Sequence, residues 1–97
     1  MARLDVLNPV AQTVEHKVDP APRLTTLAGK RVGLWWNMKA GGDVALDRVA
    51  ELISQKFPGA SFKHYQGSVG ASLRHATAKD ADRVAAECDV VVGSTSD

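Results

Sequence analysis

The sequence is short of cysteine, of excess charge and of long hydrophobic runs, and each shortage excludes a class of protein. Its single cysteine, Cys88, excludes an internal disulfide framework and fits a reducing compartment. The 12 Lys and Arg residues are balanced by 11 Asp and Glu residues without a run of one sign, so no surface for nucleic acid or anionic membrane is indicated. Because neither a signal peptide nor a membrane-length span is present, we expect a cytoplasmic protein with no nucleic-acid or membrane partner.

The 97 residues predict an amino-terminal arm, residues 1–23, followed by one small α/β domain, residues 24–97. Three of the four prolines lie in the first segment, at Pro9, Pro20 and Pro22, which favours an extended chain over a helix. The arm also carries apolar residues, namely Leu7, Val10, Val14 and Val18. These residues favour an arm that lies across its own domain or a partner, and the alternative is a disordered terminus.

Apolar periodicity predicts three short strands and two helices in alternation. The strands are expected at residues 31–36, at 60–65 and from Val90 onward. The first helix begins at Asp43 and has Leu46, Val49, Ala50, Ile53 and Phe57 at helical spacing. The second helix has the same spacing at Ala81, Val84, Ala85 and Cys88. A capping box formed by Thr77 and Asp80 marks its start. Since side chains alternate along a strand, Trp35 and Trp36 must be covered on opposite faces of the sheet.

This order of elements predicts a βαβαβ unit with a parallel sheet, the half of a Rossmann-like or flavodoxin-like three-layer domain. The uninterrupted apolar run from Val90 to Val92 is typical of a central buried strand. A sheet of three parallel strands has two open edges. We therefore expect another chain, a second polypeptide or a second copy, to complete the sheet.

Two loops are the candidate binding site, because ligands of open α/β sheets bind beyond the carboxyl ends of the strands. The first loop contributes Asn37, Lys39, Gly41 and Gly42. Its polar side chains, together with backbone N–H groups at a helix start, can hold a carboxylate or phosphate. The alternative is a plain connecting loop, since neither the Walker pattern nor G-x-G-x-x-G is matched.

The second loop follows the third strand and contributes Gly93, Ser94, Thr95, Ser96 and Asp97. Its hydroxyls and carboxylate suit the cap of a further helix, yet the chain stops there, so we expect it to be one part of a larger active unit. A serine nucleophile lacks a nearby histidine in the sequence. His75, in the loop after the second strand, is the histidine best situated to reach the crevice.

Other chemistry-bearing residues have simpler interpretations. Cys88 lies on an apolar stripe, which favours core packing over a redox or nucleophilic role. His16, His64 and His75 lack metal-ligand spacing, so we expect no metal site. The two tryptophans are expected in the core, although the one nearer the strand end can line a pocket. Without the glycine fingerprint, or an acidic residue ending the second strand, we expect no dinucleotide and no other cofactor.

Several segments in this order resemble the amino-terminal half of the UGSC family. They are Ala21–Leu24, Leu27–Leu34, Asn37-x-Lys39 before a helix, and Glu87–Gly93 with Asp97. The family is named for a motif that begins with selenocysteine or cysteine. In such relatives the buried strand and a glycine-containing loop ending in Asp lead directly into [U/C]-G-S-C. This chain is similar up to Asp97, over most of residues 21–97, and lacks the motif itself.

The resemblance implies that Asn37 and Lys39 occupy polar positions of the family's first loop, and that Gly93 and Asp97 precede its reactive position. It implies a small (alpha) subunit of a hetero-oligomeric enzyme whose partner brings the reactive cysteine, or a precursor cut after Asp97 to leave an amino-terminal cysteine. In such a site Lys39 binds or polarises a small anionic or carbonyl substrate, and Asp97 orients or deprotonates a partner group.

The reaction class stays open among thiol-dependent hydrolysis, lyase or hydration chemistry, and redox chemistry. The alternative is a non-catalytic structural or ligand-binding subunit that completes the sheet of its partner.

Overall fold

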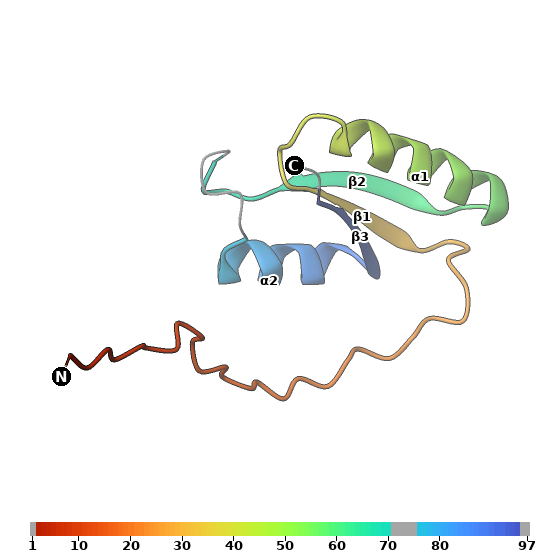
Figure 1. The fold of residues 1–97 in the computed structure, drawn as a ribbon. Helices are drawn as coiled ribbons and strands as arrows, with labels where there is room; N and C mark the ends of the chain where they lie inside the picture. Colours follow the sequence, from red (N-terminus) through yellow and green to blue (C-terminus); the bar gives the residue numbers. More distant parts are fainter. Residues whose placement is uncertain (1, 71–75, 96–97) are drawn as a thin grey trace.

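The structure is a computed structural model, and it describes residues 2–70 and 76–95. Its elements follow the predicted order: β1 Arg31–Trp36, α1 Gly42–Lys56, β2 Ser61–Gln66, α2 Ala78–Glu87 and β3 Val90–Ser94 (Figure 1). The predicted strands and helices are thus confirmed, with small shifts at their ends. None of the helices in this part of the chain is both long and apolar enough to cross a membrane.

The three strands form one parallel sheet in the order β2-β1-β3, which confirms the α/β class. Val32 at the centre lies between Phe62 of β2 and Val90 of β3. The two helices lie on opposite faces of the sheet, giving three layers (Figure 1). This arrangement is compatible with a Rossmann-like domain.

In the part of the chain that the structure describes, the apolar strand β3 lies at an edge of the three-stranded sheet. Within the described residues it pairs with β1 alone, and β1 occupies the middle of the sheet. Gly33 shows why β1 suits this position: a Cβ atom there would lie 2.8 Å from Sγ of Cys88 and 3.3 Å from the ring of Tyr65. The middle strand therefore has neighbours packed closely against its backbone.

The hydrophobic core lies between the sheet and α1. Val32 and Leu34 of β1 and Leu46 of α1 are almost fully buried. The residues packed around them are Trp36, Ala50, Phe62, Val90 and Val92. Trp35 and Trp36 are only half-buried, and of the two only Trp36 packs against this core.

Helix α2 has its predicted capping box but buries little of its predicted apolar stripe. The Thr77 hydroxyl accepts the N–H of Asp80, and the Asp80 carboxylate accepts the N–H of Thr77. Val84 is buried, whereas Ala81 and Ala85 are exposed. The helix leans toward β2, where the Arg83 guanidinium lies 5.5 Å from the centre of the Tyr65 ring.

The arm forms no helix or strand over residues 2–23, and all of these residues are exposed. Figure 1 shows it running away from the domain on the side of α2. It makes the molecule 75 Å long although the other dimensions are 31 and 25 Å.

Candidate functional site

The carboxyl ends of β1 and β3 lie next to each other, with Trp36 paired to Ser94. From β1 the chain passes through α1 to β2 on one side, and then returns through α2 to β3 on the other side. The strand order therefore reverses between β1 and β3, and such a switch point is where open α/β sheets bind ligands. The two loops singled out in the sequence thus begin side by side at this edge of the sheet, which we call the candidate crevice.

The loop after β1 is held by its own hydrogen bonds. The indole Nε1 of Trp36 donates to the carbonyl oxygen of Lys39 at 2.7 Å, and the N–H of Gly42 donates to the same oxygen at 3.2 Å. The Asn37 Oδ1 atom accepts the N–H of Lys39 at 3.3 Å. Trp36 and Asn37 therefore shape the loop that presents Lys39.

Glycine allows the start of α1 to approach the end of β3 closely. Gly41 is the N-cap of α1, with φ of 92° and no side-chain cap. Gly42 is buried, and a Cβ atom there would lie 2.8 Å from Oγ of Ser94 and 2.9 Å from Cδ1 of Trp36. The Ser94 hydroxyl donates to the Gly42 carbonyl oxygen at 3.2 Å. The positive end of the α1 dipole is thereby fixed at the crevice, where it favours an anion.

The remaining candidates differ in position. Gly93 is exposed, with open space where a Cβ atom would stand, and Thr95 is exposed beside the crevice. Asn37 and Lys39 are half-buried. His75, Ser96 and Asp97 lie outside the described residues. The structure therefore gathers Asn37, Lys39, Gly41, Gly42 and Ser94 at one point.

Met38 was not among the site residues predicted from the sequence. It has φ of 64°, a left-handed conformation that is rare and costly for a residue other than glycine. Met38 also lines a groove of about 400 Å³ along the end of β2, together with Lys63, His64, Tyr65, Gln66, Gly67, Ser68, Gly70 and Arg83. Strained backbone beside a groove is frequent at ligand sites, but no sequence pattern predicts a left-handed methionine.

Asp80 ties the end of β2 to the start of α2. Asp80 is 5% exposed, and its carboxylate accepts the N–H and hydroxyl of Ser68, at 3.1 and 3.0 Å, and the N–H of Thr77 at 3.0 Å. The backbone donors of Thr77 and Ser68 hold the pKa of Asp80 well below its usual range. The sequence predicted the capping role, but the bond to Ser68 depends on the tertiary fold.

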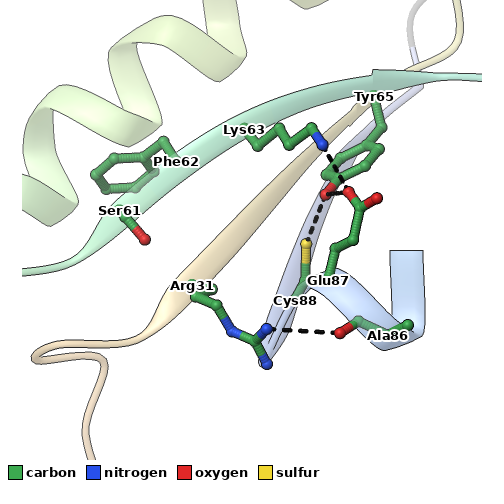
Figure 2. A pocket seen from close by; sticks show the side chains of 8 residues that line it. All are labelled: Arg31, Ser61, Phe62, Lys63, Tyr65, Ala86, Glu87 and Cys88. Atoms are coloured by element: carbon green, nitrogen blue, oxygen red, sulfur yellow. Dashed lines mark hydrogen bonds and ion pairs between the residues drawn. The ribbon is translucent and has the colours of Figure 1, made fainter. Parts of the chain in front are cut away.

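A second polar cluster lies on the α2 face, around Tyr65 (Figure 2). The Tyr65 hydroxyl donates to Oε2 of Glu87 at 2.6 Å, Lys63 Nζ lies 2.7 Å from the same oxygen, and the Cys88 thiol donates to Tyr65 at 3.3 Å. The bonds with Cys88 and Glu87 raise the pKa of Tyr65, and Lys63 lowers the pKa of Glu87. These side chains line a cavity of about 340 Å³ that also includes Arg31.

The only cysteine of the chain therefore does not reach the candidate crevice. Cys88 follows α2 and precedes β3, at the amino ends of the strands, whereas the crevice lies at their carboxyl ends. Nearby, the Asp89 carboxylate accepts the N–H of Arg31 at 2.8 Å and pairs with its guanidinium at 3.0 Å. Arg31 lowers the pKa of Asp89 to about 2. These contacts join the start of β1 to the residue before β3, so this end of the sheet has a structural role.

The crevice itself offers a helix start, a lysine and amide groups, a set suited to holding an anionic group. No cluster of three or more His, Cys, Asp or Glu side chains that could hold a metal ion occurs in residues 2–70 and 76–95.

Comparison with known proteins gives one match. The model of the UGSC family matches residues 5–97, which confirms the resemblance seen in the sequence and extends it into the arm. No curated protein and no solved structure matches the chain.

Proposed function

Because this chain belongs to the UGSC family, we propose that it is the small subunit of a hetero-oligomeric enzyme whose partner polypeptide supplies the reactive cysteine or selenocysteine. The observation that carries this proposal is the separation between Cys88 and the crevice. A thiol-dependent reaction at the ends of β1 and β3 cannot use a cysteine at the opposite ends of the strands. The nucleophile must then come from outside these residues, and this subunit contributes the binding loop.

The free edge of β3 supports completion of the sheet by that partner. The edge strand β2 carries Lys63, and a charged side chain of this kind discourages pairing with other chains. Strand β3 has the sequence VVVGS and no charged residue. An apolar edge strand without such protection is suited to pair with a further strand. The partner strand then extends the order β2-β1-β3 at its β3 side.

The substrate that fits the crevice best is a small anionic or carbonyl compound. The start of α1 holds its negative group, with Gly41 and Gly42 allowing close approach of the backbone. Lys39 binds or polarises the same group, and Asp97 orients the reactive group of the partner. A reducing cytoplasm keeps the thiol available for hydrolysis, lyase or hydration chemistry, or a redox step.

The test uses the complex isolated from native cells through a tagged copy of this chain. The reactive thiol or selenol of the partner is alkylated with iodoacetate, which is anionic, and with iodoacetamide, which is neutral. We expect iodoacetate to react faster in the wild-type complex, and Lys39→Ala to lower its rate roughly tenfold, because one charge-assisted contact is lost. Lys79→Ala, at an exposed lysine on α2, is the matched control.

The outcomes separate an enzyme subunit from a structural one. A complex in which both reagents react alike, and in which Lys39→Ala changes nothing, indicates a subunit that only completes the sheet. Sequencing the first residues of the partner shows in addition whether a precursor was cut to expose its cysteine.

A further inference from the structure

The groove of about 400 Å³ at the end of β2, which we call the β2 groove, adjoins the candidate crevice along one edge of the sheet. Trp36, the last residue of β1, is paired with Ser94 on the crevice side and with Gln66, which lines the groove, on the other side. Neighbouring strands lie about 4.8 Å apart, so one small elongated molecule can span from the crevice to the groove. Met38 belongs to both, because it lines the groove and precedes Lys39 in the crevice loop.

The lining of the β2 groove is basic. Among the described residues that line it are Lys63 and Arg83 and no Asp or Glu. The Lys63 ammonium has three donors, one of which goes to Glu87 at 2.7 Å (Figure 2). The Arg83 guanidinium has five donors and lies 5.5 Å from the centre of the Tyr65 ring. Even with Glu87 beside them, these two side chains keep a net positive charge, which suits an anionic group in the groove.

The backbone of Met38 is the second observation. Its left-handed φ of 64° places a strained residue on the wall between the crevice and the groove. Hydrogen bonds hold the chain in this conformation, because the carbonyl oxygen of the next residue, Lys39, accepts both the indole N–H of Trp36 and the N–H of Gly42. Strain of this kind persists where the surrounding fold enforces it, and it is frequent where a residue contacts a ligand.

We infer that the crevice and the β2 groove form one binding site, and that its substrate is an elongated molecule with an anionic group at each end. One group binds at the start of α1 beside Lys39, and the other binds to Lys63 and Arg83 in the groove. Met38 contacts the carbon chain between them. The inference rests on the proposed function, whose small anionic or carbonyl substrate it narrows to a dianion such as a short dicarboxylate.

An NMR titration of the full chain labelled with ¹⁵N tests the inference. The probes are succinate, glutarate and adipate, each compared with the monocarboxylate of the same chain length, namely butyrate, valerate and hexanoate. We expect at least one dicarboxylate to bind about tenfold more tightly than its monocarboxylate, because a second charge-assisted contact is added. It should shift the amide signals of both Gly42 and Ser68, which lie at the two ends of the site, whereas the monocarboxylate should shift that of Gly42 alone.

Arg83→Gln should remove this tenfold gain and leave the binding of the monocarboxylate unchanged. Arg48→Gln, at an exposed arginine on α1, is the matched control and should keep the gain. No gain in affinity from the second carboxylate, including no binding at all, overturns the inference. So does a gain that survives Arg83→Gln, or a Ser68 signal that does not move.

The titration also separates this inference from the proposed function, because the partner polypeptide takes no part in it. A negative titration removes the two-ended substrate and leaves the reactive group of the partner to the alkylation test. A partner without cysteine or selenocysteine would contradict the proposed function and leave the tighter binding of the dicarboxylate in place.

Discussion

The hydroxyl of Ser94 donates a hydrogen bond of 3.2 Å to the carbonyl oxygen of Gly42, joining the end of β3 to the first turn of α1. These residues are far apart in the sequence, yet they close one wall of the candidate crevice. The contact depends on the missing side chain of Gly42, because a Cβ atom would lie 2.8 Å from the Ser94 oxygen. Because Gly42 has no side chain, the start of α1 can lie directly against the end of β3, where this hydrogen bond holds it.

Gly42→Ala should weaken this contact. The added methyl group must displace Ser94 or Trp36, and we expect a loss of about 1–3 kcal/mol in the free energy of unfolding, as for other overpacked sites. Gly93→Ala is the control, because its Cβ atom meets nothing within 4 Å, and it should change stability by less than about 0.5 kcal/mol. Urea unfolding measures both. Equal effects of the two variants would contradict this reading of Gly42.

Tyr65 is the only tyrosine, so its ionisation can be followed by ultraviolet absorbance without interference from another phenol. Hydrogen bonds with Cys88 and Glu87 raise its pKa, so the native protein should titrate above the ordinary value of about 10. Because the folded state favours the protonated phenol, this stabilisation is present below that value and is lost as pH rises through the folded pKa.

Glu87→Gln removes the charge that Tyr65 faces and should move the titration midpoint back toward the ordinary value. A native midpoint near about 10, unchanged by Glu87→Gln, would show that the cluster in Figure 2 is not formed in solution.

Acid should destabilise the protein through Asp89 and Asp80. Both carboxylates have lowered pKa values in the fold, about 2 for Asp89, because they accept hydrogen bonds from Arg31 and from Thr77 and Ser68. Their stabilisation is complete above the unfolded pKa of about 3.9 and is lost as pH falls through the folded values. The melting temperature should therefore drop below about pH 4. Asp89→Asn should lower it near neutral pH and flatten its acid dependence, and parallel curves for both proteins would refute the role of Asp89.

Thr77→Ala removes the hydroxyl half of the capping box and should cost about 1 kcal/mol. Thr77→Ser keeps the oxygen and should recover most of this loss. Thermal unfolding of the two variants measures the difference. If both variants unfold at the same temperature as the wild type, the cap does not contribute to stability.

The sequence could predict the elements that depend on local patterns. Helix α1 follows from the spacing of Leu46 and Ala50, and the start of α2 follows from the pair Thr77 and Asp80. The two loops at the crevice follow from the rule that ligands bind at the carboxyl ends of strands. These features require no knowledge of which strands are neighbours.

Features that depend on tertiary neighbours were not predictable. The position of β3 at the edge is set by pairing, and the same apolar sequence suits a central strand. Tyr65 meets Glu87 and Cys88, which lie 22 and 23 positions further along the sequence, only because β2 and the end of α2 pack together. The left-handed backbone of Met38 has no signature in its residue type.

Native mass spectrometry of the complex isolated from its own cells tests the central claim most directly. The account predicts this chain bound to a second polypeptide whose cysteine or selenocysteine is alkylated in the assembled state and protected by a bound anion. The chain recovered only by itself or with further copies of itself, or with a partner that has neither residue, would contradict it.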